Sequence, residues 1–536
     1  MNPKIRVAVL LDGRGLPAWQ SYIVEQLRAS DYATVDLLLL VGDGSPEGHR
    51  KPFLYRAFAK RDARRPVAAP DACAKTDIEN WMPGIERLRF PQGTAPTSRD
   101  GPAMEQIIGE IGTRELDLIL AFSGLRRIDE LASIAKQGVW FYRHGYRQMA
   151  CEDGQTVGFW EVVKRRPFVY SSLNRRLPGS PDEVLYDSFS PVNHLSHFTT
   201  RNEHLWKIQS FVPRVLRRLH RGSSDSRGKR TDEEDAACIP LSSLRLLAGL
   251  TSYAFWRVRQ KRARKMYSRR WILLFTRGAP EDWSGYRKLV PPKGRFWADP
   301  HVLRRDGGDY VFFEDASLEA WRGHLSVMCL SANASEPEVR KIIERPYHLS
   351  YPFLLEWKGE TWIIPESGEN RTVEAYRCRE FPFRWEYSHC LMKDVSAYDA
   401  TLFQHDGIWW MFANVREHEG ASTWDELCLF YADDPLSESW RPHPMNPIVS
   451  DVRQARPGGP LFCRDGRIFR PSQNSSYRYG YGLNINEVLE LSETGYRERV
   501  VERIEPNWDR NVQGIHSYSA IDGLAVVDAI YRSRKP

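Results

Sequence analysis

His405-Asp-Gly-Ile-Trp-Trp-Met411 joins a polar turn to a run of aromatic and β-branched residues, and this pattern governs the C-terminal half of the chain. The same pattern recurs at three other places: Gly307-Gly-Asp-Tyr-Val-Phe-Phe313, Lys358-Gly-Glu-Thr-Trp-Ile-Ile364 and Arg464-Asp-Gly-Arg-Ile-Phe469. The glycines at 308, 359, 407 and 466 lie 51, 48 and 59 residues apart. Hairpins that recur about every 50 residues are typical of propeller blades, and a β-sandwich is the weaker alternative.

A strand-like segment lies at each end of this repeating region. Trp271–Thr276 precedes the first repeat, and Ala525–Tyr531 follows the last one. We expect these two segments to pair and to complete a fifth blade. The sequence therefore predicts a five-bladed β-propeller over residues 271–536.

The N-terminal half has a different rhythm, in which short apolar runs alternate with segments of helical spacing. We expect strands at 5–11, 35–41, 116–122 and 138–142, and helices at 17–29 and 104–111. Strands that are apolar throughout are typical of a buried parallel sheet. This pattern predicts an α/β domain with a Rossmann-type, mostly parallel sheet over residues 1–215.

Residues 216–270 form the predicted connection between the two domains. Residues 221–237 are polar and rich in Gly and Ser, which indicates a linker, and residues 241–266 have helical spacing. Eight Lys and Arg residues and no acidic residue lie between Arg257 and Arg270. The segment is either a solvated basic helix or a surface that docks on an anionic membrane through 241–270. The apolar residues at helical spacing are Leu244, Leu247, Leu250, Ala254, Phe255 and Val258.

The composition excludes several classes of protein. The 536 residues carry 76 basic and 69 acidic side chains, and this mild excess of +7 predicts no nucleic-acid partner. The eight cysteines include no CxxC pair, so we predict neither a disulfide framework nor a metal site. No apolar run has the length of a signal peptide or membrane span. We therefore expect a cytoplasmic protein that is membrane-associated if the basic helix docks.

Part of the N-terminal half resembles a known family. Leu116–Ile119, Gly138–Gly145 and Gly158–Glu161 resemble the N-terminal domain of formyltransferases, over about residues 4–210. The resemblance implies an Asn-x-His pair, in which His144 matches but Tyr142 stands at the Asn position. Loss of such an oxyanion donor lowers a rate by about 10²–10³. It therefore implies a degenerate domain and disfavours 10-formyltetrahydrofolate as cofactor, with His144 as a candidate formyltransferase-like site.

The propeller half carries a longer set of motifs. They are Phe296-Trp-Ala-Asp299-Pro, Phe312-Phe-Glu-Asp315, Ser350-Tyr-Pro352, Ile364-Pro-Glu366-Ser, Tyr398-Asp399-Ala-Thr, His443-Pro-Met-Asn-Pro447, Arg456-Pro-Gly-Gly and Arg470-Pro-Ser-Gln473. In this order they resemble the domain that precedes the transferase part of plant glucosamine inositolphosphorylceramide transferases. That domain is similar to the five-bladed propellers of arabinanases and levansucrases, which implies chemistry on sugars.

Three carboxylates in these motifs are candidate catalytic residues. Residues at the start of the inner strands of a propeller converge on its axis, so Asp299, Glu366 and Asp399 are expected to meet there. Glycosyl chemistry uses two carboxylates, one as acid and one as base or nucleophile. We assign Asp299 as base or nucleophile and Glu366 as acid, while Asp399 orients substrate or tunes a pKa. The alternative for each is an ordinary role in a turn.

Four further residues are candidates for binding substrate. Arg456, Gln473 and His516 are suited to sugar hydroxyls or a phosphate, and Trp297 offers a face for stacking. Arg456 has the alternative role of pairing with a carboxylate of a blade.

These observations lead to one favoured function and two alternatives. The favoured one is a transferase that assembles or modifies a cell-surface glycan or glycolipid, for which a nucleotide sugar is one candidate donor. The first alternative is a glycan-binding propeller without catalysis, beside a degenerate formyltransferase domain. The second is N-formylation of an amino sugar through His144. A Ca²⁺ ion in the propeller channel stays an open alternative.

Overall fold

The computed structural model describes residues 2–12, 15–41, 51–64, 69–77, 81, 83–90, 102–122, 128–145, 156–222, 241–277, 285–330 and 337–535. The chain divides into two compact units. The first consists of Met1–Ala254 with His418–Ser422, and the second of Phe255–Glu417 with Thr423–Pro536.

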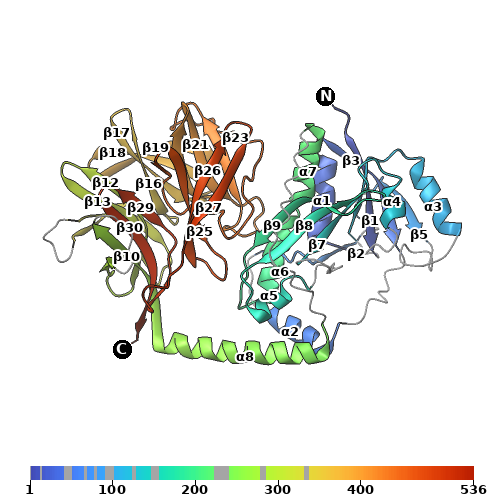
Figure 1. Ribbon diagram of the computed structural model, residues 1–536, viewed down its shortest axis with the longest axis horizontal. Coiled ribbons are helices and arrows are strands. Elements are labelled where there is room, and N and C mark those ends of the chain that lie inside the picture. The colour runs from blue at the N-terminus through green and yellow to red at the C-terminus, as the bar shows by residue number, and fades with distance from the viewer. Residues whose placement is uncertain are drawn as a thin grey trace. The chain divides into compact units, whose positions relative to one another are not determined.

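The first unit is built on a seven-stranded sheet in the order β5-β3-β1-β6-β7-β8-β9 (Figure 1). The strands β5, β3, β1, β6 and β7 run parallel to one another, whereas β8 is antiparallel to β7 and β9 is antiparallel to β8. The central strand β1 is buried along its apolar run because helices or loops cover both faces of such a sheet. The strands are β1 (Ile5–Asp12), β3 (Ala33–Val41), β5 (Glu86–Phe90), β6 (Leu118–Ala121), β7 (Val139–His144), β8 (Val169–Arg176) and β9 (Glu183–Ser190), and β2 (Gly15–Pro17) pairs with β4 (Lys75–Asp77) apart from them.

Helices accompany this sheet, and they confirm an α/β architecture. Those of the described residues are α1 (Ala18–Ala29), α2 (Phe53–Asp62), α3 (Pro102–Gly112), α4 (Ile128–Ala132), α5 (Phe159–Lys164), α6 (His197–Ile208), α7 (Phe211–His220) and α8 (Ser243–Met266). None of these helices combines the length and the apolar character that crossing a membrane requires.

The expected connection between the domains needs two adjustments. Helix α7 runs through residue 215 and buries Phe211, Val212 and Leu216, so the first domain does not end there. Helix α8 begins at Ser243, close to the expected start, and the division between the units falls within it. Most of the predicted linker, residues 223–237, lies outside the described residues.

The second unit is a five-bladed β-propeller, as the sequence predicts (Figure 1). Blades 1 to 4 are four-stranded antiparallel sheets that follow one another along the chain. Blade 1 comprises β12 (Arg295–Arg305), β13 (Gly308–Ser317), β14 (Gly323–Cys329) and β15 (Val339–Ile343). Blade 2 comprises β16 (Ser350–Trp357), β17 (Glu360–Ser367), β18 (Thr372–Glu380) and β19 (Arg384–Lys393). Blade 3 comprises β20 (Ala397–His405), β21 (Ile408–Val415), β22 (Leu427–Ala432) and β23 (Arg441–Pro442), and blade 4 comprises β24 (Phe462–Arg464), β25 (Arg467–Asn474), β26 (Gly482–Leu491) and β27 (Tyr496–Ile504).

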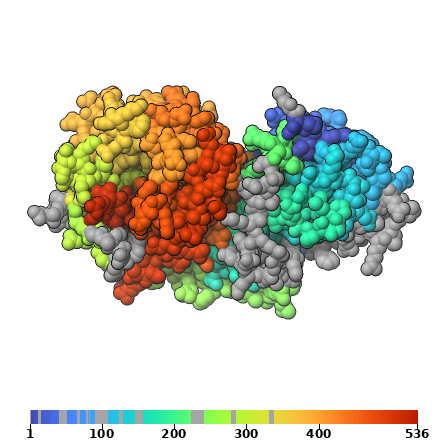
Figure 2. Space-filling model, turned by 45° about the horizontal axis from the view of Figure 1, so that its top comes forward, coloured from blue at the N-terminus to red at the C-terminus, as the bar shows by residue number. Residues whose placement is uncertain are grey.

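Blade 5 joins the two ends of the propeller sequence. Strand β10 (Tyr267–Arg277) pairs along its whole length with β30 (Leu524–Arg534), and Trp271 lies opposite Ile530. The other strands are β11 (Arg287–Leu289), β28 (Val512–Gly514) and β29 (Tyr518–Ile521). In the space-filling view, residues near the red C-terminal end lie beside yellow-green residues of the first blade (Figure 2). The pairing predicted from the sequence is confirmed, and it closes the ring of blades.

Tight turns explain why the repeat is visible in the sequence. The hairpins between the first and second strands turn at Asp306-Gly307, Lys358-Gly359, Asp406-Gly407 and Asp465-Gly466, and all eight residues have positive φ. Two consecutive positive φ values define the type I′ turn, which fits the right-handed twist of the strands. The structurally equivalent glycine of the first repeat is therefore Gly307 and not Gly308.

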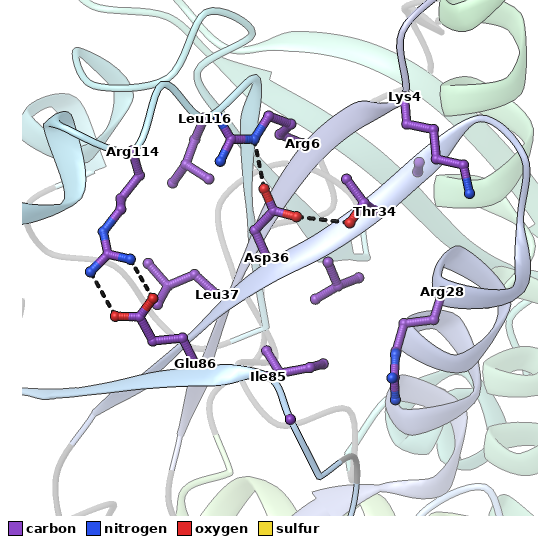
Figure 3. A pocket seen from close by; sticks show the side chains of 13 residues that line it. Lys4, Arg6, Arg28, Thr34, Asp36, Leu37, Ile85, Glu86, Arg114 and Leu116 are labelled. Atoms are coloured by element: carbon purple, nitrogen blue, oxygen red, sulfur yellow. Dashed lines mark hydrogen bonds and ion pairs between the residues drawn. The ribbon is translucent and has the colours of Figure 1, made fainter.

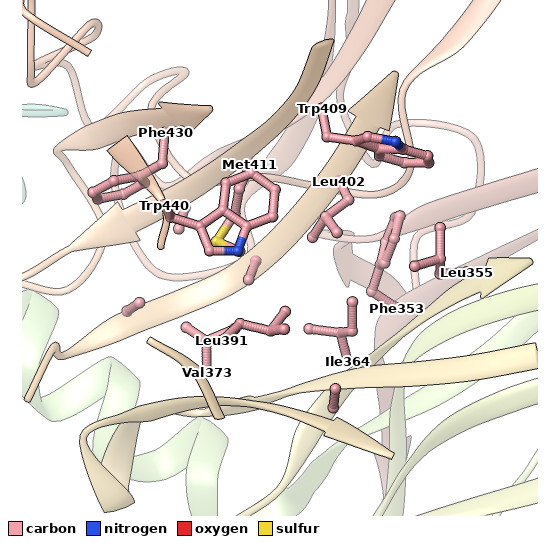
Figure 4. Close-up of a cluster of buried hydrophobic side chains, with 14 of the residues drawn as sticks. Phe353, Leu355, Ile364, Val373, Leu391, Leu402, Trp409, Met411, Phe430 and Trp440 are labelled. Atoms are coloured by element: carbon pink, nitrogen blue, oxygen red, sulfur yellow. The ribbon is translucent and has the colours of Figure 1, made fainter. Parts of the chain in front are cut away.

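Apolar clusters between neighbouring blades hold the propeller together. The largest one described joins blades 2 and 3 and includes Phe353, Ile364, Trp409, Met411 and Trp440 (Figure 4). Each of these side chains is at most 8% exposed. Apolar side chains thus fill the space between the faces of neighbouring blades. Polar side chains gather at the ends of the inner strands instead.

Candidate functional site

The inner strands of three blades share an unusual backbone feature near their first residues. The register of the inner hairpin breaks between Ala298 and His301 in blade 1, between Ser350 and Phe353 in blade 2, and between Tyr398 and Thr401 in blade 3. Inside each break lies a residue with positive φ: Asp299 at 51°, Tyr351 at 44° and Asp399 at 53°.

A left-handed backbone at a residue other than glycine costs about 1–2 kcal/mol. Bulges re-aim a side chain and are frequent near functional sites. Three blades thus accept the same strain to direct Asp299, Tyr351 and Asp399, whose side chains are buried. The repetition shows that the bulge belongs to the architecture of the site and is not an accident of one turn.

A second row of polar residues comes from the strands next to the inner ones. Glu314 lies opposite Ala298, Glu366 opposite Ser350 and Asn414 opposite Tyr398. These three side chains occupy equivalent positions in blades 1, 2 and 3. The predicted acid Glu366 therefore reaches the site from the second strand of its blade, and not from the inner strand.

Arg456 joins the carboxylates of blades 2 and 3. Its Nε donates to Oδ2 of Asp399 at 2.6 Å, and its Nη2 donates to Oδ1 of Asp399 at 3.2 Å and to Oε2 of Glu366 at 2.9 Å. The guanidinium also lies over the rings of Tyr398 and Tyr479, with its central carbon 5.6 and 5.3 Å from their centroids. Such a fork geometry fixes both carboxylates in place.

Gln473 completes the environment of Asp399. Its amide nitrogen donates to Oδ2 of Asp399 at 2.8 Å and to the carbonyl of Pro457 at 2.9 Å. The amide oxygen Oε1 is buried and has no hydrogen-bond partner among the described residues. Asp399 is thus a fully engaged, buried acceptor, and Gln473 keeps one oxygen available.

Asp528 of blade 5 connects His516 and Ser517 with Asp299 of blade 1. Its Oδ1 accepts hydrogen bonds from the backbone N–H groups of His516 and Ser517, each at 3.0 Å. Its Oδ2 accepts one from the backbone N–H of Asp299 at 2.9 Å and lies 2.6 Å from Nδ1 of His516. Nε2 of His516 lies 3.6 Å from Oδ1 of Asp299, and the ring stacks on Trp271 with centroids 4.1 Å apart.

Burial controls the proton affinity of these carboxyl groups. It raises the pKa of Asp299 to about 7, against the opposing effect of His516 and with the help of Asp399. Burial also raises the pKa of Glu366 well above its usual value, although Arg456 opposes this. Burial raises the pKa of Glu314 as well, and Asp299 and Glu366 reinforce that rise.

His516 shows the opposite balance. Burial alone would lower the pKa of its imidazole, but the carboxylates of Asp528 and Asp299 outweigh burial and raise it. Five buried carboxyl groups (Asp299, Glu314, Glu366, Asp399 and Asp528) face the cations Arg456 and His516. Two cations cannot balance the five buried negative charges of this carboxylate cluster, and this excess favours the raised pKa values of Asp299, Glu314 and Glu366.

One possible ligand atom from each of Asp299, His516 and Asp528 lies within 4.8 Å of the other two. Among the described residues, these three side chains form the group with a spacing that could hold a metal ion. Both oxygens of Asp528 already accept hydrogen bonds from backbone N–H groups. Oδ1 of Asp299 is buried and has no hydrogen-bond partner among the described residues. Ca²⁺ requires six to eight oxygen ligands, so this set does not fit such an ion.

One predicted binding residue, Trp297, packs in an apolar cluster between blades. Trp297 is 6% exposed and packs in an apolar cluster, with its ring 5.2 Å from that of Phe313. Successive side chains of a strand alternate between its two faces. The bulge that contains Asp299 interrupts this alternation, so Asp299 does not share the direction of Trp297. The side chain of Trp297 thus packs in the core between blades, and its assignment to sugar stacking stays a prediction.

Sequence reasoning missed Asp528 and Glu314. Both lie in otherwise apolar strands, in Val526-Val-Asp-Ala529 and in Phe312-Phe-Glu-Asp315. A carboxylate inside an apolar strand was the available signal, because such groups are rarely buried unless they are paired.

In the first unit, the predicted residue His144 lies at the end of β7 in a buried chain of side chains. Its Nδ1 lies 2.7 Å from Oγ of Ser171, which lies 2.6 Å from Nε2 of His204. Tyr142, at the position where formyltransferases have Asn, donates its hydroxyl to the carbonyl of Ile208 at 2.9 Å. Burial lowers the pKa of His204 well below its usual value. His144 as a formyltransferase-like residue stays a prediction.

A pocket of about 510 Å³ lies at the opposite, amino-terminal edge of this sheet (Figure 3). Nε of Arg6 donates to Asp36 at 2.6 Å, and Nη2 of Arg114 donates to Glu86 at 2.6 Å. These two ion pairs neutralise much of the charge of its lining. No candidate residue of the sequence analysis lies here, and the pocket is separate from His144.

The fold and the site together define a class of protein: a β-propeller with a buried cluster of carboxylates at the axial ends of its strands. Residues 290–521 match the family model described as "Glucosamine inositolphosphorylceramide transferase 1, N-terminal". The resemblance of the propeller half to this family is thereby confirmed.

Curated proteins with this family's name are similar to part of the chain. Glucosamine inositolphosphorylceramide transferase 1 of Oryza sativa subsp. japonica is 31% identical over 206 residues, which are 38% of this chain and 27% of that protein. The protein of that name from Arabidopsis thaliana is equally similar over the same shares. The matched part therefore spans about a quarter of the length of these relatives, at 27%.

Two solved structures are similar to this chain at lower sequence identity. The family 117 glycoside hydrolase Zg3597 of Zobellia galactanivorans is 11% identical with a TM-score of 0.33, over 49% of this chain and 90% of that chain. The α-L-arabinanase of Cellvibrio cellulosa is 10% identical with a TM-score of 0.29, over 40% of this chain and 78% of that chain.

Proposed function

We propose that the propeller is a carbohydrate-active domain that transfers a glycosyl group in the assembly or modification of a cell-surface glycan or glycolipid. The observation that carries this proposal is the carboxylate cluster, in which Asp299 and Glu366 have raised pKa values in different surroundings. The family match over residues 290–521 supports chemistry on a glycolipid, because the named relatives are inositolphosphorylceramide transferases.

The environments of the carboxyl groups suit distinct roles. Asp299 has a pKa of about 7, so near neutral pH it alternates between proton acceptor and donor, as a general base requires. Burial raises the pKa of Glu366 well above its usual value, which is the direction that suits a general acid. Asp399 is held by Arg456 and Gln473 and serves as the positioning group.

The experiment is a turnover assay of the full chain with a panel of nucleotide sugars and a glycolipid acceptor. Asp299→Asn and Glu366→Gln keep the shape of each side chain but remove its ability to exchange a proton, so each is expected to lower the rate by at least about 10²-fold. Asp309→Asn is the matched control, because Asp309 is a buried carboxylate bonded to Arg277 and Arg304 at the far end of blade 1. Turnover that survives in both site variants contradicts the proposal.

The alternative of a glycan-binding propeller is favoured by one specific feature. Asp399, Glu366 and Asp528 already bond to Arg456, to Gln473 and to backbone N–H groups. Such a network holds a rigid binding surface without any turnover. Saturable binding of a sugar with no product from any donor supports this alternative.

The proposal includes contact with an anionic membrane through α8, since a glycolipid acceptor lies in a bilayer. One face of α8 packs through Leu246 and Tyr253, which are buried. The opposite face exposes large apolar side chains, with Leu244 81% and Phe255 68% exposed. The full exposed set follows the helical repeat and comprises Leu244, Leu247, Phe255, Val258 and Met266.

Charge indicates what this exposed face contacts. Helix α8 carries seven Lys and Arg residues and no acidic residue: Arg245, Arg257, Arg259, Lys261, Arg262, Arg264 and Lys265. An apolar stripe flanked by cations is suited to the surface of an anionic leaflet, where each cation contributes about 1 kcal/mol.

Sedimentation with vesicles tests this contact. The full chain is expected to bind phosphatidylcholine vesicles that contain phosphatidylserine, and to bind less in high salt. Phe255→Ser is expected to weaken binding without lowering the melting temperature, because the side chain is exposed. Val501→Ser, a control at an exposed apolar residue of β27, is expected to leave binding unchanged. Equal binding by Phe255→Ser and the wild-type chain contradicts this contact.

A further inference from the structure

Two exposed aromatic residues of the propeller adopt a backbone conformation that bulky residues rarely have. In the described chain, 13 residues other than glycine have positive φ, and most are Asp, Lys or Arg in turns. Trp321 has φ of 51° and is 71% exposed, and Tyr477 has φ of 62° and is 42% exposed. A strained backbone under a bulky side chain that stays largely exposed gains little burial in return, which indicates a function.

Both residues lie in equivalent loops. Trp321 lies between the second and third strands of blade 1, and Tyr477 lies between the second and third strands of blade 4. In each blade the second strand ends at the side where the inner strand begins. The two loops therefore lie on the side of the propeller that holds the carboxylate cluster, as Glu314 and Gln473 near the ends of these second strands show.

The loop that carries Trp321 is connected to the carboxylate cluster through His348. Nδ1 of His348 accepts a hydrogen bond from the N–H of Gly323, two residues after Trp321, at 2.9 Å. Nε2 of His348 lies 3.4 Å from Oε1 of Glu314. A Cβ atom at Gly323 would lie 2.7 Å from that oxygen, so the loop approaches Glu314 as closely as its backbone allows.

The indole of Trp321 lies beside the strand that carries Asp299. Its ring centroid is 6.1 Å from that of Phe296, with the planes inclined by 48°. Phe296 and Ala298, the neighbour of Asp299, pack in one apolar cluster with Ala316. The indole of Trp321 thus extends this apolar cluster outward, and most of its own surface stays in contact with solvent.

We infer that Trp321 is the stacking platform of a sugar-binding subsite at the entrance to the carboxylate cluster, and that Tyr477 supports the same ligand from blade 4. The ligand class is a pyranose ring, whose C–H face packs on an aromatic face while its hydroxyls stay in water or bind polar groups of the surrounding loops. This inference rests on the proposed carbohydrate function and assigns the residue that selects the acceptor or donor ring.

A stacking role for Trp321 and a purely structural role predict different effects of substitution on sugar binding and on the melting temperature. Trp321→Ala is expected to weaken sugar binding about tenfold, or ~1.4 kcal/mol, without lowering the melting temperature. Trp321→Gly is expected to raise the melting temperature, because glycine adopts positive φ without strain. Trp321→Tyr keeps an aromatic face and is expected to retain part of the affinity.

The experiment is calorimetric titration of the full chain with UDP-N-acetylglucosamine, glucosaminyl-inositol and methyl β-glucoside, accompanied by thermal melts. Phe383→Ala is the control, because Phe383 is also exposed but lies between β18 and β19, at the other end of its blade. Binding by the wild-type chain that Trp321→Ala leaves unchanged overturns the platform alone. A melting temperature that falls in both Trp321→Ala and Trp321→Gly also overturns it, and no binding of any probe by the wild-type chain contradicts the proposed function instead.

Discussion

Nδ1 of His516 lies 2.6 Å from Oδ2 of Asp528, and the same oxygen accepts the backbone N–H of Asp299 at 2.9 Å. One carboxylate of blade 5 thereby fixes the imidazole that faces Asp299 and the strained backbone from which Asp299 projects. The charge of His516 opposes the rise in the pKa of Asp299. Asp528 is therefore a positioning residue, and it acts on Asp299 both through the backbone and through His516.

Asp528→Asn is expected to move the titration of Asp299 to higher pH. Loss of the Asp528 charge lowers the pKa of His516, because Asp528 is the largest cause that raises it. A neutral His516 no longer lowers the pKa of Asp299, and this effect exceeds the loss of the direct repulsion by Asp528. The pH–rate profile of glycosyl transfer is expected to shift its acidic limb above pH 7. An unchanged limb, with Asp309→Asn as control, contradicts this coupling.

The stability of the propeller is expected to depend on pH through Asp299. Its pKa in the folded chain, about 7, lies above its ordinary value of 3.8, so its contribution to stability is complete below pH 3.8 and is lost as the pH rises through 7. Each tenfold difference in proton affinity between the folded and unfolded chain corresponds to ~1.4 kcal/mol. Asp299→Asn lacks this loss, so its free energy of unfolding relative to the wild-type chain is expected to increase between about pH 4 and pH 8. Urea denaturation at both values measures it, and a difference that is independent of pH contradicts the raised pKa.

Arg456→Met is expected to destabilise the propeller strongly. It leaves the buried carboxylates of Asp399 and Glu366 without their shared cation, a change that costs about 3–5 kcal/mol for buried pairs. Arg453→Met is the control, because the pair of Arg453 with Asp451 is more accessible, with 23% of the arginine side chain exposed. Denaturant unfolding compares the two variants. Equal losses of stability in both contradict the central role of Arg456.

Deletion of residues 524–536 is expected to prevent the propeller from folding. These residues include the whole of β30, which pairs with β10 from Arg277 to Tyr267 and closes the ring. Without β30, the edge of β10 is open and prone to aggregation. Circular dichroism melts check this expectation, and deletion of residues 535–536 alone is the control. A cooperative melt of the shorter chain, like that of the wild-type chain, contradicts closure as a requirement.

Much of the propeller can be predicted because local signals and the global fold agree. The turns Lys358-Gly359, Asp406-Gly407 and Asp465-Gly466 need two positive φ values, which restricts their residues and makes the repeat visible. The pairing of the two ends follows from the same repeat, since four complete blades leave one strand pair unassigned. The boundary at residue 215 was less predictable, because α7 continues through it without a change in composition.

The site is only partly predictable for a physical reason. Arg456 precedes Pro457 and two glycines, and Gln473 follows Pro471 and Ser472, so both stand out in the sequence as polar residues beside residues that interrupt a strand. Asp528 lies inside an apolar strand, and only the folded structure shows that three backbone N–H groups converge on it. The packing of Trp297 between blades is likewise visible only in the folded structure, because the sequence does not show which face of β12 lies against the neighbouring blade.

The melting temperature of the full chain, with and without nucleotide sugars, is the sharpest test of a sugar site in the propeller. A ligand that binds only the folded state raises this temperature by mass action. We predict an increase that is lost in Asp299→Asn and is retained in His144→Ala, because the sugar binds in the propeller. An increase that is lost in His144→Ala and retained in Asp299→Asn would contradict this prediction and would place the binding site in the α/β unit.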